Sequence, residues 1–134
     1  IDNAFENTYP RYSKRGDAIL YFSKKHTKSV NDELYVNNFI TKQEKRLTAS
    51  TTNNYFATWS NNGTRLAYSS VVEIGVPEIF FMNKDGLNVR QITFNSGGST
   101  LPNWSPNDIN ILITGKRNGY EQICKILLKE KKNT

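Results

Sequence analysis

At 134 residues the chain is long enough for one domain with a buried core, and its 37% hydrophobic and 12% aromatic residues are typical of a globular protein, not a disordered one. No apolar run approaches the roughly 20 residues of a membrane helix, so we expect no membrane span. The single cysteine excludes an intrachain disulfide, and the net charge of +6 comes with no aromatic-interleaved basic stripe, which argues against nucleic-acid binding.

Three similar segments follow one another along the chain, each marked by a serine at the end of a short strand. These serines are Ser13, Ser60 and Ser105, so successive repeats are offset by 47 and then 45 residues. Each serine precedes a tight turn and then an apolar strand. The apolar strands are residues 18–23, 65–70 and 110–114. Short runs of β-branched and aromatic residues between turn residues predict β-strands.

The turn after each serine needs a residue at positive φ. Gly16 and Gly63 supply it in the first two repeats, and Asp108 stands there in the third, where we expect some strain. We expect the serine to close the turn by accepting from backbone N–H groups two or three residues further on. A large aromatic residue precedes each serine and is expected to fill the wedge between adjacent sheets. These aromatic residues are Tyr12, Trp59 and Trp104.

A third strand in each repeat opens on a glutamate, and a fourth closes on an apolar residue followed by threonine. Because a residue that recurs at one position usually builds the repeat itself, we expect the glutamates to be structural rather than ligand-binding. They are Glu33, Glu78 and Glu121. The same alignment places Cys124, as a small buried apolar residue, at the position of Val36 and Phe81.

The pattern predicts an all-β fold of four-stranded antiparallel meanders. One such sheet cannot bury both of its faces, whereas sheets stacked radially can, which is the architecture of a β-propeller. We therefore predict three four-stranded blades, at about residues 1–48, 49–93 and 94–134. Since propeller rings have roughly 4–8 blades, the chain is expected to be part of a longer propeller or to complete a ring as a homodimer.

Residues suited to catalysis or metal binding are scarce. The chain lacks a Gly-x-Ser-x-Gly elbow, and His26, its only histidine, lies in a polar loop. One histidine and one distant cysteine do not make a zinc site, and Asp85-Gly86 is explained by a hairpin turn instead of a calcium loop. The sequence therefore predicts no catalytic residue, no metal and no cofactor. Gly97-Gly98 is interpreted as a flexible connection between repeats.

The loops between the second and third strands differ from repeat to repeat, whereas the turns after the serines are uniform. Variable loops on a rigid scaffold are where recognition commonly resides, so we predict a partner site on the rim that carries these loops. The candidate partner-binding residues are Val71, Val72, Ile74, Arg117 and Tyr120.

Three stretches resemble the WD-like β-propeller repeat of the TolB family, namely residues 59–63, 78–86 and 91–93, and residues 104–108 carry the same pattern. The resemblance implies a six-bladed propeller of which three blades are present. It also implies a non-catalytic protein of the bacterial periplasm that docks partner proteins, such as an envelope lipoprotein or a membrane-complex component, on one face. Because the chain begins with Ile1, we expect any signal peptide to precede it.

Three alternatives stay open at this point. The chain could be the propeller domain of a prolyl-oligopeptidase-like peptidase, which would need a separate hydrolase domain. It could come from an oligogalacturonate-lyase-like protein, although one histidine is too few for the metal site of such a protein. The charge of +6 also fits binding to an acidic glycan, which salt would weaken.

Overall fold

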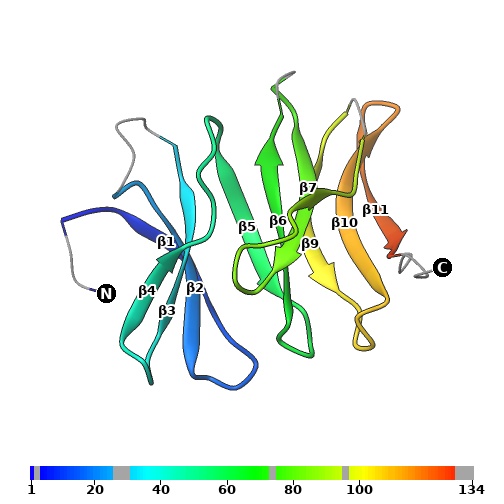
Figure 1. Ribbon diagram of the computed structural model, residues 1–134. Coiled ribbons are helices and arrows are strands. Elements are labelled where there is room, and N and C mark those ends of the chain that lie inside the picture. The colour runs from blue at the N-terminus through cyan, green and yellow to red at the C-terminus, as the bar shows by residue number, and fades with distance from the viewer. Residues whose placement is uncertain (2–3, 26–30, 73–74, 95–96, 129–134) are drawn as a thin grey trace.

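The computed structural model describes residues 1, 4–25, 31–72, 75–94 and 97–128, and its regular elements are all β-strands. The strands form three antiparallel sheets that stand side by side in chain order (Figure 1). Within these residues, no helix has the length and apolarity to cross a membrane. The all-β prediction is confirmed.

Each sheet is a meander in which strands adjacent in the sequence pair with one another. The first contains β1 (Asn7–Tyr12), β2 (Ala18–Ser23), β3 (Glu33–Asn38) and β4 (Gln43–Arg46). The second contains β5 (Asn54–Trp59), β6 (Arg65–Val71), β7 (Pro77–Asn83) and β8 (Arg90–Gln91). The third contains β9 (Ser99–Trp104), β10 (Asn110–Arg117) and β11 (Tyr120–Leu127), three strands within the described residues.

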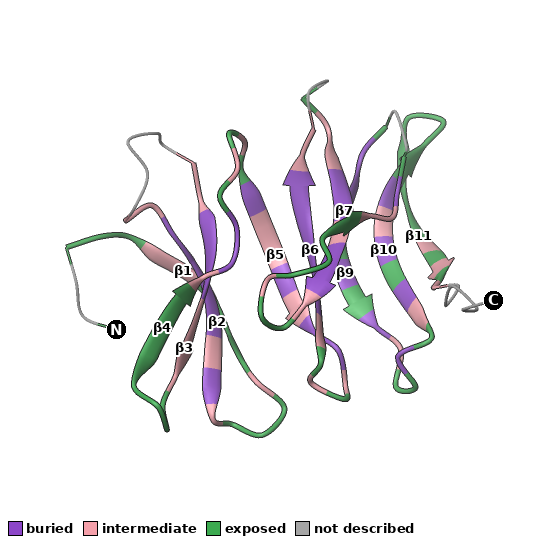
Figure 2. Ribbon diagram, in the orientation of Figure 1, coloured by how far each residue is buried: buried purple, intermediate pink, exposed green. Residues whose placement is uncertain are grey.

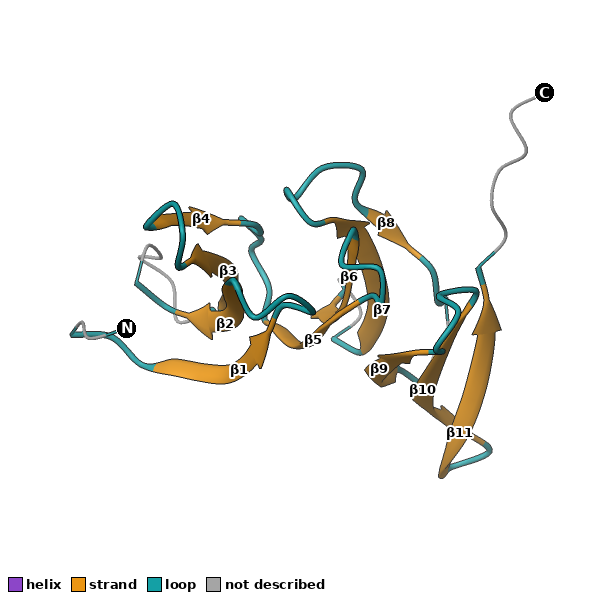
Figure 3. Cartoon of the chain, turned by 90° about the horizontal axis from the view of Figure 1, so that it is seen from below, coloured by secondary structure: helices purple, strands orange, loops and turns teal. Residues whose placement is uncertain are grey.

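The sheets fan out from their first strands. β5 contacts both β1 and β9, whereas β4 and β8 lie on the far side of their sheets (Figure 3). We call the interface between the first and second sheets the first seam, and that between the second and third sheets the second seam. This radial arrangement is that of three successive propeller blades, as the repeats predict.

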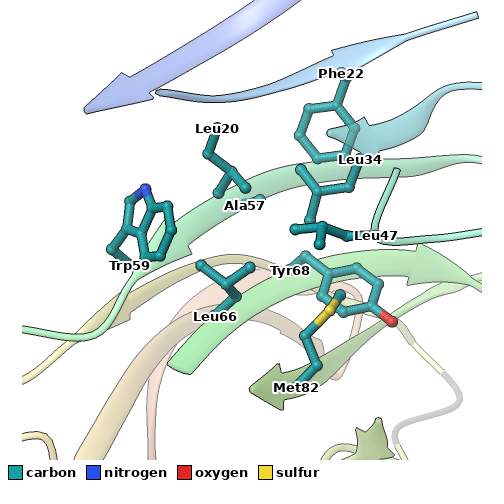
Figure 4. Close-up of a cluster of buried hydrophobic side chains, with 9 residues drawn as sticks. All are labelled: Leu20, Phe22, Leu34, Leu47, Ala57, Trp59, Leu66, Tyr68 and Met82. Carbon is teal, nitrogen blue, oxygen red and sulfur yellow. The ribbon is translucent and has the colours of Figure 1, made fainter. Parts of the chain in front are cut away.

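Each seam is filled by its own apolar core. The first core joins Leu20 and Phe22 of β2 to Trp59, Leu66 and other side chains of the second sheet (Figure 4). The second core lies in the second seam and consists of Ala67, Ile79, Trp104, Ile111 and Ile113. Buried residues are concentrated on the strands that face the seams (Figure 2). Stability therefore depends on contacts between blades, because a single four-stranded sheet on its own leaves its faces exposed to solvent.

The aromatic residue before each turn serine fills a seam in two of the three repeats. Trp59 belongs to the first core and Trp104 to the second, as expected. The expectation is wrong for Tyr12, which is 73% exposed. No described sheet lies against that side of the first blade, so Tyr12 only touches Phe39 edge-on, with ring centroids 6.4 Å apart.

The turns after the serines have the predicted backbone. Gly16, Gly63 and Asp108 adopt φ values of 73°, 71° and 58°. The predicted role of the serine hydroxyl needs a correction, because it bonds across the whole turn. The N–H of the residue five positions on donates to each serine Oγ, at 2.9–3.1 Å. Each hydroxyl thus fixes the start of the following strand.

The third blade corrects the alignment of its last strand. β10 and β11 are joined by Asn118 and Gly119 alone, so their pairing is set by a two-residue turn in which both residues have positive φ. In this register Gln122 lies opposite Gly115, as Glu78 lies opposite Ser70 in the second blade. Gln122 therefore takes the position that the sequence analysis gave to Glu121.

The same shift moves Cys124. It pairs with Ile113, as Phe80 pairs with Tyr68, so it is equivalent to Phe80 and not to Phe81. Cys124 is also only partly buried, contrary to expectation. The sulfur accepts from Arg117 Nε at 3.4 Å.

Gly97 is not explained by flexibility. A Cβ built on it would lie 2.5 Å from the carbonyl oxygen of Lys116 on β10. Such a distance is far below van der Waals contact, so this position requires the close backbone approach that only glycine permits. The interpretation of Gly97-Gly98 as a flexible linker is corrected accordingly.

Candidate functional site

The rim that carries the variable loops contains a groove of about 690 Å³ across the first seam. One wall is the connection from β4 to β5, and the other is formed by β6, β7 and the segment around β8. We call it the rim groove. Its lining residues are Leu47, Thr48, Ala49, Ser50, Thr51, Thr52, Asn54, Tyr68, Ser70, Val71, Val72, Phe80, Val89 and Gln91.

A buried carboxylate holds the first wall in place. Glu33 is fully buried and accepts from the Thr48 hydroxyl, from Ser50 N–H at 2.9 Å and from Asn54 Nδ2 at 3.2 Å. Arg46 Nη2 lies 3.3 Å from the same carboxylate. Because these donors neutralise and satisfy the charge, the connection is pinned to β3. The structural interpretation of Glu33 is supported by these contacts.

Glu78 has the matching contact in the second blade, where the Thr93 hydroxyl donates to its carboxylate. Thr93 Oγ1 also accepts from Ile79 N–H at 2.8 Å, as Thr48 Oγ1 accepts from Leu34 N–H at 2.9 Å. The threonine that follows the fourth strand in the first and second blades is therefore a fixed part of each.

The floor of the rim groove is aromatic. Tyr68 and Phe80 stack with ring centroids 5.7 Å apart. Burial, and secondarily the negative charge of Glu33, raise the pKa of Tyr68 to about 12. Its hydroxyl is therefore protonated at neutral pH, and the groove combines an apolar floor with hydroxyl groups along its edge.

The structure brings together only part of the predicted partner site. Val71 and Val72 line the rim groove and are partly exposed. Arg117 and Tyr120 are not loop residues, because they pair with each other at the end of the β10–β11 hairpin, where Tyr120 is 73% exposed. They share the rim with the groove but do not line it (Figure 1). Ile74 and His26 lie outside the described residues.

A second feature, on the inner strands, was missed by the sequence analysis. Tyr9, Phe56 and Leu101 have φ values of 51°, 56° and 54°, each at a β-bulge in the first strand of its blade. All three line one cavity of about 290 Å³. This backbone conformation costs a non-glycine residue conformational free energy, and such outliers occur at functional sites more often than elsewhere. A large apolar residue four positions before each repeat serine was the available signal.

A third feature, also missed, crosses the second seam. Asp108 Oδ1 accepts from Asn61 N–H at 2.6 Å, and Oδ2 accepts from Asn62 N–H at 2.8 Å. Asn61 Nδ2 donates to Asp108 Oδ1 at 3.0 Å and to Ser105 O at 2.7 Å. We call this set of bonds the Asp108 clamp. It ties the turn of the third blade to the turn of the second.

Among the described residues, no group of three or more histidine, cysteine, aspartate or glutamate side chains is placed to hold a metal ion. The described arrangement offers grooves, hydroxyl groups and exposed apolar side chains.

Comparisons with known proteins agree with this geometry. A family model described as the TolB beta propeller domain matches residues 3–134. A comparison with curated proteins found no match.

Several solved structures share the fold. A TolB from Acinetobacter baumannii superposes with a TM-score of 0.76 at 19% identity, covering 93% of this chain and 30% of that one. A TolB candidate from Agrobacterium tumefaciens superposes with a TM-score of 0.75 at 18% identity, covering 92% of this chain and 47% of that one. A structure from work on two prolyl endopeptidases superposes with a TM-score of 0.68 at 17% identity, covering 96% of this chain and 21% of that one. The chain thus spans less than half the length of these proteins.

Proposed function

Because the chain belongs to the TolB beta propeller domain family, we propose that it is a non-catalytic scaffold that docks a partner protein on its loop rim. The observation that carries this proposal is the rim groove, with Val71 and Val72 on one wall and a rigidly pinned connection on the other. A preformed groove avoids much of the ordering cost of association, which favours binding to a flexible segment of a partner.

The chemistry of the groove narrows the kind of segment that it accepts. Val72 and Val89 offer apolar contact, while Thr51, Thr52 and Gln91 offer hydrogen bonds along the edges. No charged side chain is among the lining residues described. We therefore propose an extended partner segment with alternating apolar and polar side chains. Tyr120, exposed on the same rim, adds an aromatic anchor for a larger partner.

Export to the bacterial periplasm, and an envelope lipoprotein or membrane-complex component as the partner, follow from the family resemblance. They form part of the proposal. Fractionation of cells that produce the whole protein tests the location, because a periplasmic protein is released by osmotic shock together with a periplasmic marker. Retention in the cytoplasmic fraction would contradict export.

Site-specific photo-cross-linking tests the docking surface. A photoreactive phenylalanine analogue at Val72 should give a discrete cross-linked species with one partner protein. The same analogue at Ile109, an exposed residue beside the third serine turn on the opposite rim, is the control and should give none. Cross-links at Ile109 but not at Val72 would place the partner on the wrong face and overturn the proposal.

A peptidase propeller is the second candidate, since the fold of a structure from work on prolyl endopeptidases also matches. In that case the whole protein would cleave proline-containing peptides, and a serine-directed inhibitor would abolish the cleavage. Purified whole protein without such activity would favour the scaffold. Binding to an acidic glycan, suggested by the charge of +6, would weaken steeply with salt, unlike docking in an uncharged groove.

We also propose that two copies of this segment can complete a six-bladed ring. The outer face of the third blade exposes Leu112, Ile123 and Leu127. The opposite end, on the first blade, contains the stacked rings of Tyr21 and Tyr35, which are already buried and have the Lys25 ammonium over them. In the first seam the equivalent aromatic pair, Tyr68 and Phe80, packs against the core of the preceding blade. A second copy would cover the exposed apolar side chains of the third blade.

A further inference from the structure

The lower rim of the first seam, opposite the rim groove, contains a separate cavity of about 340 Å³. It lies between the serine turn of the first blade and that of the second. Its lining residues are Ser13, Lys14, Arg15, Asp17, Ala18, Val36, Asn38, Trp59, Asn62, Gly63, Thr64, Lys84 and Asp85. We call it the seam cavity.

The repeat supplies a direct comparison, because the second seam has the same parts. There the Asp108 carboxylate accepts from the N–H groups of Asn61 and Asn62, the two central residues of the preceding turn. In the first seam the equivalent turn is closed in the same way, with Gly16 N–H donating to Ser13 O at 3.0 Å. Its two central residues are Lys14 and Arg15. Gly63 takes the place of Asp108, so no carboxylate reaches them.

The N–H groups of Lys14 and Arg15 consequently lack a hydrogen-bond acceptor in the part of the chain that the structure describes. Two successive N–H groups that point the same way form a recess for an anion, as the bound carboxylate of Asp108 demonstrates one blade further on.

A second replacement enlarges the cavity. In the second seam the guanidinium of Arg65 covers the Trp104 ring, with Cζ 5.1 Å from the ring centroid. The equivalent pair in the first seam is Ala18 and Trp59, and both line the cavity. Ala18 places no cation over Trp59, which is 8% exposed, against 7% for Trp104, so Trp59 contributes a largely buried apolar wall to the cavity.

Charge around the cavity favours an anion. Lys14, Arg15 and Lys84 contribute three cationic side chains to the lining. The two carboxylates in the lining are engaged in their own turns. Asp17 accepts from the Ser13 hydroxyl at 2.6 Å, and Asp85 accepts from Leu87 N–H at 3.0 Å.

We infer that the seam cavity is a binding site for a carboxylate, held by the backbone N–H groups of Lys14 and Arg15 and flanked by Trp59. The carboxylate comes from a bound peptide, either from its C-terminus or from an acidic side chain. The site lies on the rim opposite the proposed docking groove and is independent of that proposal.

Nuclear magnetic resonance of the intact ¹⁵N-labelled protein tests this site. Titration with sodium acetate should shift the amide signals of Lys14 and Arg15 until they saturate. Sodium chloride at the same ionic strength should not. The amides of Asn61 and Asn62 are the internal control and should stay unchanged, because Asp108 already occupies their site. Absence of a saturable shift at Lys14 and Arg15, or an equal shift at both turns, would overturn the inference.

A variant that rebuilds the missing side chain gives an independent test. A Cβ on Gly63 meets open space, and its φ of 71° resembles the 58° of Asp108. Gly63→Asp should therefore fill the recess with its own carboxylate and weaken acetate binding on the order of tenfold or more. Gly63→Asn, which tolerates the same backbone conformation without a charge, should weaken it less. Unchanged affinity in Gly63→Asp would contradict the site.

Two peptides distinguish the sources of the carboxylate. One has a free C-terminus and no acidic side chain, and the other is blocked at both ends and carries a single glutamate. Saturation by the first at the lower concentration assigns a chain terminus, and saturation by the second assigns an acidic side chain. If neither peptide binds although acetate does, the peptide assignment is wrong.

Discussion

Asp108 combines two roles that separate residues would otherwise hold. Its backbone adopts the positive φ that glycine provides in the other two turns, and its carboxylate bonds to the neighbouring blade. Burial alone would raise the pKa of this carboxyl group. The N–H groups of Asn61 and Asn62 and the charge of Arg65 outweigh burial and hold the pKa below its ordinary value of 3.8. The ionised form therefore stabilises the second seam.

Asp108→Asn is expected to lower the free energy of unfolding at pH 7 by about 1–3 kcal/mol, because it removes the charge from buried hydrogen bonds. The folded-state pKa is depressed, so the stabilisation is present above about pH 4 and is lost as the pH falls through the folded value. Urea unfolding of the unsubstituted protein and of Asp108→Asn at pH 7 and pH 3 measures their free energies of unfolding. The difference between these two free energies should be smaller at pH 3 than at pH 7.

Asp85→Asn is a matched control for this prediction, because Asp85 is an exposed turn carboxylate that accepts one backbone N–H. It should change the free energy of unfolding little at either pH. An equal loss of unfolding free energy in Asp85→Asn and Asp108→Asn would show that the Asp108 clamp stabilises the protein no more than an exposed turn carboxylate does.

Single positions also show where sequence reasoning stops. The positive φ at Asp108 follows from the repeat, since glycine occupies that place twice. Its bonds to Asn61 and Asn62 do not follow, because they join residues 46 and 47 positions apart whose types give no pattern. The left-handed Tyr9, Phe56 and Leu101 were missed for a related reason. Their recurrence four positions before each serine marks a repeat position, but an apolar residue type does not reveal that its backbone has a positive φ.

At the scale of strands and turns, the predicted elements agree with the structure where the periodicity is strong. β2, β6 and β10 lie where the apolar runs predict them. The register of β11 was misplaced, because the alignment followed the glutamate at Glu121 while the pairing follows the two-residue turn before it. A shift of one residue moves every side chain to the other face of a strand. The pairing of a hairpin should therefore be assigned first from the length of its turn and only then from matching residue types.

Gly97→Ala is expected to destabilise the protein by about 1–3 kcal/mol, because the added methyl group overlaps the backbone of β10. Lys116 N–H donates to Gly98 O at 3.2 Å beside this contact. Hydrogen exchange should therefore show a specific loss of protection at the Lys116 amide. Gly75→Ala places a methyl group in open space at a φ of 80°, so its backbone strain stays in that loop and should leave the Lys116 amide unaffected. Unchanged protection in Gly97→Ala would refute the close-packing argument.

On the scale of the whole molecule, three repeats became three blades with two filled seams. The radial arrangement could be predicted, because the sheets repeat along the chain and radial stacking buries both of their faces. The two seams differ in a way that the repeats conceal. Both have apolar cores, but only the second has the Asp108 clamp. The sequence placed a partner site on the rim that carries the variable loops, and this stays a prediction, while the groove on that rim depends on the buried contacts of Glu33, which the sequence did not show.

The proposed ring of two copies predicts that the 134-residue chain has twice its 15.4 kDa mass in light scattering. Leu112→Lys and Ile123→Lys should each weaken the dimer by placing a charge in the apolar face that a second copy would cover. Leu87→Lys changes an exposed leucine in a turn and should leave the mass unchanged. A stable monomer in the unsubstituted chain would contradict the ring.

The paired threonine and glutamate of the first two blades also set an order of events during synthesis. Thr48 follows Glu33 by fifteen residues, and Thr93 follows Glu78 by the same interval. The carboxylate is costly to bury until its threonine has left the ribosome and arrived as a donor. A blade can therefore close only when its own last strand emerges, and the chain would assemble from its N-terminus one blade at a time.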